Sequence, residues 1–274
     1  ACALFGVQED NYTNDVTIKQ LSLDIGCALH ADALKKGFTS KSFVGNTILS
    51  TYCKCRSICD AENIFTRLSE NNVVSWSVLM SGYVEVGQSA KALQLYSWMQ
   101  KQGISPDDRT LMFALQACCY LVDEDELFIK DIKLNGKIVL EIGHALHADA
   151  VKSGFASSVF VENTVLSVYA KCRSICEAEK VFSKISKHVV SWNAMLSALL
   201  EMREGRKALY LYKEMQECGV KPDKWTLTIV LQACGIVWDE EAAIDDELTK
   251  VMVVQMCYSL HADSVWKGFA DDFL

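Results

Sequence analysis

The sequence predicts an all-α fold, a right-handed superhelical solenoid of two-helix hairpins without a sheet. The first observation is a repeat: residues 26–70 and 143–187 match at 28 of 45 positions without a gap, and a third copy begins at Ser259. Self-similarity at a long fixed period is typical of stacked structural units. The second observation is apolar spacing of i, i+3, i+4 and i+7 in hairpin-length segments, with only two prolines in 274 residues.

The period divides into three kinds of helical hairpin. His30, His147 and His261 mark equivalent positions, at spacings of 117 and 114 residues. We therefore expect one solenoid over 1–274 with no internal domain boundary. Its units would be 1–41 (partial long), 42–72 (short), 73–107 (standard), 108–158 (long with an acidic insertion), 159–188 (short), 189–223 (standard) and 224–272 (long with an acidic insertion).

The standard units show the hairpin most clearly. In 73–107 two apolar stripes flank Gly87, and Gly103 and Pro106 end the second helix. The copy at 189–223 repeats this pattern, and such stripes predict core packing. The stripes are Trp76, Leu79, Met80 and Tyr83, then Ala92, Leu95, Tyr96 and Met99, matched by Trp192, Met195, Leu196 and Leu199, then Ala208, Leu211, Tyr212 and Met215.

The short and long units vary this theme. The short units carry a second-helix stripe of Ala61, Ile64, Phe65 and Leu68, matched by Ala178, Val181, Phe182 and Ile185. The long units have a first helix around TLMFALQAC or TLTIVLQAC and a second helix through ALHADAVKSGF. An acidic insertion separates these two helices, and we expect it to be a loop that is dispensable for folding.

The net charge of −8 argues at first against nucleic acid. The acidity, however, is concentrated in 3–19, 120–139 and 235–250, which together carry −9, while the remaining chain carries +1. The twelve cysteines fall mostly at repeat-equivalent positions and predict small buried hydrophobes in a reducing compartment. No apolar stretch is long enough to predict a transmembrane helix.

The sequence predicts no catalytic site, metal or cofactor. The repeated histidines stand in H-A-D, whereas a zinc-dependent cytidine deaminase needs H-x-E and a C-x-x-C pair, and no two cysteines here stand three apart. The N-terminus lacks the features of a targeting peptide. Because the chain starts without Met inside a repeat, we expect it to be a fragment, with any targeting segment or deaminase domain outside it.

A unit that opens with V-V-S-W and ends in Gly-x-x-Pro-Asp resembles the pentatricopeptide repeat. The alternation of short, standard and long units is similar to the plant PLS subclass, and the resemblance covers essentially the whole chain. The long units depart from it, since 108–158 and 224–272 exceed an ordinary unit of about 35 residues. The resemblance implies single-stranded RNA binding in a mitochondrion or chloroplast, at a site of C-to-U editing or other transcript processing. It implies RNA-editing proteins as further partners, and neither DNA nor membrane binding.

The resemblance also implies which residues contact RNA. The fifth and last residues of each unit would read one base, and the second residue would pack against bases. The target, read 5′ to 3′ over five units, would be C-G-N-Y-U, with a purine preference at the sixth. The reading pairs are Asn46 with Asn72, Ser77 with Asp107, Met112 with Ser158, Asn163 with His188, Asn193 with Asp223, and Thr228 with Asp272; the packing residues are Phe43, Val74, Phe160 and Val190.

Two other functions remain open at this stage. Acidic loops and a negative net charge also suit a helical-repeat scaffold that binds proteins, and the ragged ends suit the product of a decayed gene. Ser, Asn and Asp at these positions also have a purely structural explanation as helix caps and turn residues. RNA binding separates the first function from the other two.

Overall fold

The computed structural model describes residues 21–38, 42–68, 70–123, 128–129, 132–133, 136–185 and 187–242. Its helices belong to two compact units that divide between Ile132 and Lys133, inside an acidic insertion. A single continuous solenoid over 1–274 therefore stays a prediction. Within the described ranges, no helix combines the length and apolar character needed to cross a membrane.

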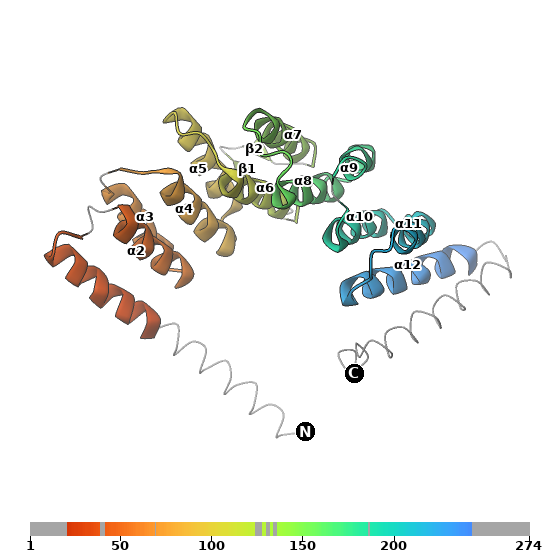
Figure 1. The fold of residues 1–274 in the computed structure, drawn as a ribbon, viewed down its shortest axis with the longest axis horizontal. Helices are drawn as coiled ribbons and strands as arrows, with labels where there is room; N and C mark the ends of the chain where they lie inside the picture. The colour runs from red at the N-terminus through yellow and green to blue at the C-terminus, as the bar shows by residue number, and fades with distance from the viewer. Residues whose placement is uncertain are drawn as a thin grey trace, which may run out of the picture. The chain divides into compact units, whose positions relative to one another are not determined.

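The first compact unit is a row of paired helices. Residues 21–35 are helical, and α2 and α4, the first helices of their hairpins, pack side by side, as do α4 and α6. Each second helix packs on its own partner and on the first helix that follows (Figure 1). The elements are α2 (Ser42–Lys54), α3 (Ile58–Arg67), α4 (Val73–Glu85), α5 (Ser89–Lys101) and α6 (Asp108–Asp123).

The second compact unit repeats this arrangement. The first helices α8 and α10 pack together, and α10 packs on α12. The second helix α9 packs on α8 and α10, and α11 packs on α10 and α12 (Figure 1). The helix α7, the second helix of the long unit, packs on α8. The elements are α7 (Gly136–Lys152), α8 (Val159–Lys171), α9 (Ile175–Phe182), α10 (Val189–Glu201), α11 (Gly205–Glu217) and α12 (Lys224–Ala242).

The predicted apolar stripes form the cores, which confirms the all-α hairpin fold. Trp76 and Trp192 are among the largest fully buried side chains of the described residues. The Phe65 ring packs edge-to-face on Trp76, with centroids 4.9 Å apart, and Phe182 packs on Trp192 in the same way at 5.0 Å. These aromatic pairs join the second helix of one hairpin to the first helix of the next, and their burial stabilises that contact.

The turns between helices require a left-handed residue, and the units supply it differently. Gly87 ends α4 with φ of 76°, as its sequence position predicts. At the equivalent turns Arg56, Arg173 and Arg203 adopt φ of 60°, 56° and 58°. A left-handed non-glycine residue costs roughly 1 kcal/mol or more, so these arginines are retained against local strain. Arg56 donates from Nη2 to the Glu85 carbonyl oxygen at 3.0 Å and thereby caps α4.

Three sequence expectations need correction. The expectation of no sheet is wrong in one place, because β1 (Phe128–Ile129) and β2 (Ile132–Lys133) pair in the acidic insertion. The acidic segments are partly helical, since α6 extends to Asp123, α7 begins at Gly136 and α12 extends to Ala242. The described cysteines are free thiols, but Cys27, Cys59, Cys176 and Cys218 are exposed, so burial holds only for Cys53, Cys118, Cys119 and Cys234.

Candidate nucleic-acid interface

The candidate base-contacting residues lie where one hairpin joins the next, at the N-terminal ends of first helices. The last residue of a unit is the N-cap of the following first helix: Asn72 caps α4, Ser158 precedes α8 and His188 precedes α10. Asp107 and Asp223 stand directly before α6 and α12. Asn, Asp and Ser favour this position because their side chains accept hydrogen bonds from the free backbone N–H groups of the first turn.

Asn46 and Asn72 form a hydrogen-bonded pair with a third member from the next unit. The Asn46 Nδ2 donates to Asn72 Oδ1 at 3.3 Å. The Ser75 backbone N–H donates to the same Asn72 oxygen at 3.1 Å, and the Ser75 hydroxyl donates to Asn46 Oδ1 at 2.7 Å. Because a backbone N–H can only donate, Asn72 turns its oxygen inward, and Asn46 then turns its amide nitrogen towards that oxygen.

Asn193 and Asp223 form the same arrangement with a charged member. The Asn193 Nδ2 donates to Asp223 Oδ1 at 3.0 Å, and the Thr226 backbone N–H donates to that oxygen at 2.8 Å. Burial of the carboxyl opposes its ionisation, but bonds from Thr226, Asn193 and the Trp225 backbone outweigh burial and lower the pKa of Asp223 below its ordinary value. The carboxylate is therefore a fixed, negatively charged acceptor at this position.

The pairs in the other two hairpins are arranged differently. Ser77 is buried and donates to the Val74 carbonyl oxygen at 3.0 Å, while Asp107 accepts from the Thr110 backbone N–H at 2.8 Å. Asn163 accepts a bond from the Ser191 hydroxyl at 2.7 Å. Its predicted partner His188 makes no side-chain capping bond. Among the predicted pairs of which both members are described, a direct bond joins the residues only in the Asn46 and Asn193 units.

The long units supply the remaining predicted residues. Met112 lies in a depression of about 760 Å³ beside Arg56, Gln116 and Tyr120, and Ser158 belongs to the other compact unit. The Thr228 hydroxyl donates to the Lys224 carbonyl oxygen at 2.9 Å inside its own helix. Asp272 lies outside the described residues, as does His261.

The second residues of the units form a set of exposed apolar side chains. Phe43 is 82% exposed and Phe160 is 69% exposed, and Val74 and Val190 are exposed as well. Trp225, the second residue of unit 224–272, is 65% exposed, although the sequence analysis did not name it. Counting two residues into that unit would have found it. Each exposed aromatic ring is a flat side chain of the kind on which a base can stack.

Sequence reasoning also missed the third residue of the units that begin at 73, 108, 189 and 224. These are the fully buried hydroxyl residues Ser75, Thr110, Ser191 and Thr226. Their signal was a Ser or Thr three residues after Asn72, Asp107, His188 and Asp223, which is the spacing of a helix cap. The structure shows that three of them also reach back to the fifth residue of the preceding unit, namely Asn46, Asn163 and Asn193.

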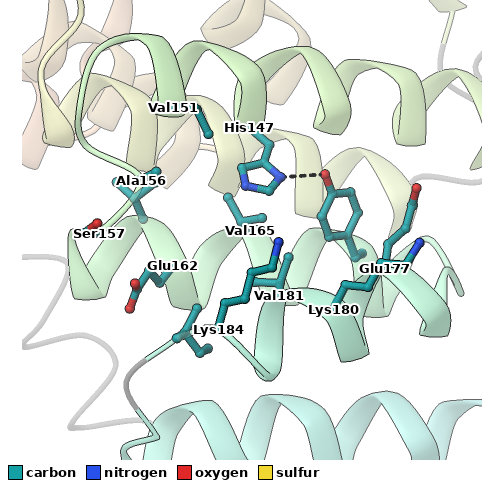
Figure 2. A pocket seen from close by; sticks show the side chains of 13 residues that line it. His147, Val151, Ala156, Ser157, Glu162, Val165, Glu177, Lys180, Val181 and Lys184 are labelled. Carbon is teal, nitrogen blue, oxygen red and sulfur yellow. Dashed lines mark hydrogen bonds between the residues drawn. The ribbon is translucent and has the colours of Figure 1, made fainter.

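A separate pocket of about 440 Å³ lies among α7, α8 and α9 (Figure 2). His147 Nδ1 lies 2.9 Å from the Tyr169 hydroxyl in this pocket, and His30 makes the equivalent contact with Tyr52 at 3.1 Å. Burial, followed by the nearby His144 and Lys184, lowers the pKa of His147. The repeated His–Tyr bond therefore ties the second helix of a long unit to the first helix of the next short unit. Among the described side chains, no cluster of three His, Cys, Asp or Glu could hold a metal ion.

Comparisons with known proteins agree with the hairpin architecture. The model of the PPR repeat family matches residues 71–120 and 187–235. A putative pentatricopeptide repeat-containing protein of Arabidopsis thaliana is 39% identical over 222 residues, which cover 80% of this chain and 30% of that protein. A mitochondrial pentatricopeptide repeat-containing protein of the same plant is 30% identical over 214 residues, covering 78% of this chain and 19% of its own length.

The chain thus spans less than a third of the length of these curated relatives. Among solved structures, the pentatricopeptide repeat protein PPR10 from maize aligns over 82% of this chain and 38% of its own, with 18% identity and a TM-score of 0.39. The hairpin core, the repeated units and the sequence matches lead to one conclusion. The chain belongs to the pentatricopeptide repeat family.

Proposed function

We propose that this chain binds single-stranded RNA, with one nucleotide per unit and the chain's N-to-C direction running 5′ to 3′ along the RNA. The observation that carries the proposal is the hydrogen-bonded pair formed by the fifth and last residues in two hairpins, Asn46 with Asn72 and Asn193 with Asp223. Each pair lies beside an exposed second residue, Phe43 in one hairpin and Val190 in the other.

The chemistry of these groups suits the edge of a base. An amide whose oxygen and one N–H are already bonded keeps one N–H and one lone pair for a ligand. The side chains are short, so little conformational entropy is lost when a base binds. The exposed Phe43, Phe160 and Trp225 rings provide stacking surfaces for the same nucleotides.

The proposed target keeps the order C-G-N-Y-U. The sites at Asn46, Ser77 and Asn193 would select cytosine, guanine and uracil, and Asn163 would select a pyrimidine. Met112 leaves the third base undetermined, because a thioether makes no strong hydrogen bond to a base.

We place this recognition in a plant organelle, as part of a PLS-subclass specificity factor for C-to-U editing or other transcript processing. Support comes from the Arabidopsis relatives, one of which is named as mitochondrial. The deaminase chemistry would then come from a partner or from another part of the full-length protein.

A filter-binding comparison tests the proposal. The purified chain is titrated with a single-stranded RNA pool and a matched DNA pool, each at two salt concentrations, because phosphate contacts weaken with salt. We expect preferential RNA retention and enrichment of C-G-N-Y-U among the bound sequences. Equal or absent retention of both pools would reject RNA recognition and favour the protein-binding scaffold.

A further inference from the structure

Four fully buried hydroxyl groups recur at one position in the repeat. They belong to Ser75, Thr110, Ser191 and Thr226, the third residues of the units that begin at 73, 108, 189 and 224. A buried hydroxyl without a partner is costly, so each of these groups needs a bond. Thr110 finds its bonds locally, at Asp107, whereas the other three hydroxyl groups also bond to the preceding hairpin.

The bonds to the preceding hairpin share one geometry. The hydroxyl oxygens of Ser75, Ser191 and Thr226 each lie 2.7 Å from an Oδ1 atom, that of Asn46, Asn163 and Asn193 respectively. These asparagines are 28 to 33 residues earlier in the sequence. A contact repeated at that separation is not required for capping a helix. It connects the three candidate reading asparagines to the units that follow them.

The chemistry of the Asn193 site fixes how its amide is oriented. Asp223 is an ionised acceptor, so the Asn193 atom that faces it must be the donor Nδ2. The amide oxygen then faces Thr226, whose hydroxyl also accepts from the Asp223 backbone N–H at 3.2 Å. The hydroxyl proton is thereby directed towards an acceptor, and the Asn193 Oδ1 is the nearer one, at 2.7 Å against 2.9 Å for Asp223 Oδ1.

We propose that the third-residue hydroxyl of the following unit is a positioning group, which holds the oxygen end of the asparagine amide at a fixed angle to the base and so sharpens base discrimination. This inference rests on the proposed RNA function. With its oxygen held by Thr226, Asn193 presents its remaining N–H to the ligand. Uracil offers carbonyl acceptors where cytosine offers an amino donor. Without the Thr226 hydroxyl, the Asn193 amide would be held by its bond to Asp223 alone and could turn about that bond, so the preference for uracil would fall.

At this site, the base preference of one hairpin depends on a residue of the hairpin that follows it. Asn193 reads correctly only when Thr226, in the next hairpin, is present. Thr110 provides a matched control within the chain, because it makes the same capping bonds to Asp107. The fifth residue of that hairpin, Ser77, bonds instead to the Val74 carbonyl oxygen. Removal of the Thr110 hydroxyl should therefore leave discrimination at the fifth base unchanged.

The test measures binding of the complete 274-residue chain to C-G-N-Y-U and C-G-N-Y-C RNAs. One well-formed contact to a base edge discriminates by roughly 5- to 150-fold, and we expect the wild type to prefer uracil within that range. Thr226→Val should lower the ratio of the two affinities, because only the bond to Asp223 then holds the Asn193 amide. Thr226→Ser should keep the wild-type ratio, and Thr110→Val should keep it as well. Thermal unfolding of each variant confirms that it is folded.

The outcomes separate the inference from the function on which it rests. A folded Thr226→Val chain with the wild-type ratio would overturn the inference. A wild-type chain that binds neither RNA, or both equally, would reject the proposed function instead. If Thr226→Val does not fold, Thr226→Ala gives the decision at the same site. An unchanged preference for uracil in that folded variant would overturn the inference.

Discussion

The side-chain amide of Asn193 donates a 3.0 Å hydrogen bond to the carboxylate of Asp223, thirty residues further along the chain. The two residues belong to one unit, but the folded hairpin brings its beginning and end together beside α12. Asn46 and Asn72 do the same beside α4, at 3.3 Å. The repeat thus creates a two-residue polar site from groups that are distant in sequence, and the apolar core holds both ends of the unit in place.

Trp225→Ala should weaken RNA binding without changing the stability of the fold. The ring is 65% exposed, so its removal takes little apolar surface out of the core. Loss of one stacked base costs roughly 1–3 kcal/mol in binding. Tyr210→Ala is the control, because Tyr210 is also largely exposed but lies on α11, a second helix. Equal losses of RNA affinity in the two variants would show that the first-helix position has no special role.

Gly143→Ala should destabilise the second compact unit. A Cβ at Gly143 would lie 2.6 Å from Val168 Cγ1, so α7 and α8 would have to separate. Overpacking of this kind costs about 1–3 kcal/mol, to be measured as the free energy of unfolding in urea. Gly136→Ala is the control, since its Cβ would meet nothing within 4 Å. A Gly143→Ala chain as stable as the control would mean that this helix contact is not tight.

Stability should fall as the pH is lowered from 7.5 to 5.5, and His147 should contribute to that loss. Its pKa in the folded chain lies below the ordinary 6.5, because of burial and then His144 and Lys184. The unfolded chain therefore binds a proton first, and the contribution is complete above 6.5 and lost below it. His147→Gln should flatten the dependence of the melting temperature on pH. An unchanged slope would show that His147 titrates normally.

The acidic insertion should be replaceable without loss of cooperative folding. Substituting 124–135 by glycine and serine of equal length removes the β1–β2 pair but leaves α6 and α7 whole. The cost of an irregular loop depends only weakly on its sequence or length. We expect a single thermal transition close to that of the wild type. Loss of cooperativity would mean that the two-stranded pair is a structural element in its own right.

The sequence was sufficient to predict the hairpins because each helix buries a stripe at helical spacing. Trp76 with Met80 and Trp192 with Leu196 face the core for that reason alone. The β1–β2 pair was not predictable, since two-residue strands carry no alternating pattern. The left-handed turns at Arg56 and Arg173 were also missed, because glycine is the usual residue there.

The positions of the candidate site residues were predictable from the sequence, but their hydrogen-bond contacts were not. Register counting places Asn46 and Ser77 at the same point of their units, yet Asn46 bonds to Asn72 and Ser75 whereas Ser77 is buried against Val74. The Asn46 amide donates through its nitrogen and accepts through its oxygen, whereas the single Ser77 hydroxyl donates to a carbonyl oxygen of its own helix. The role of Thr226 was hidden because a threonine three residues after an aspartate is fully explained by helix capping. Only the folded hairpin shows its second contact, to Asn193.

Exchange of the fifth base is the measurement that tests the central claim most directly. The wild-type chain and Asn193→Thr are titrated with C-G-N-Y-U and C-G-N-Y-G RNAs under the same salt conditions. We predict that the wild type prefers uracil, and that the substituted hydroxyl moves the preference towards guanine by roughly 1–3 kcal/mol, the usual cost of one mismatched base. Equal binding of both RNAs by both proteins would contradict the claim that Asn193 and Asp223 read a base.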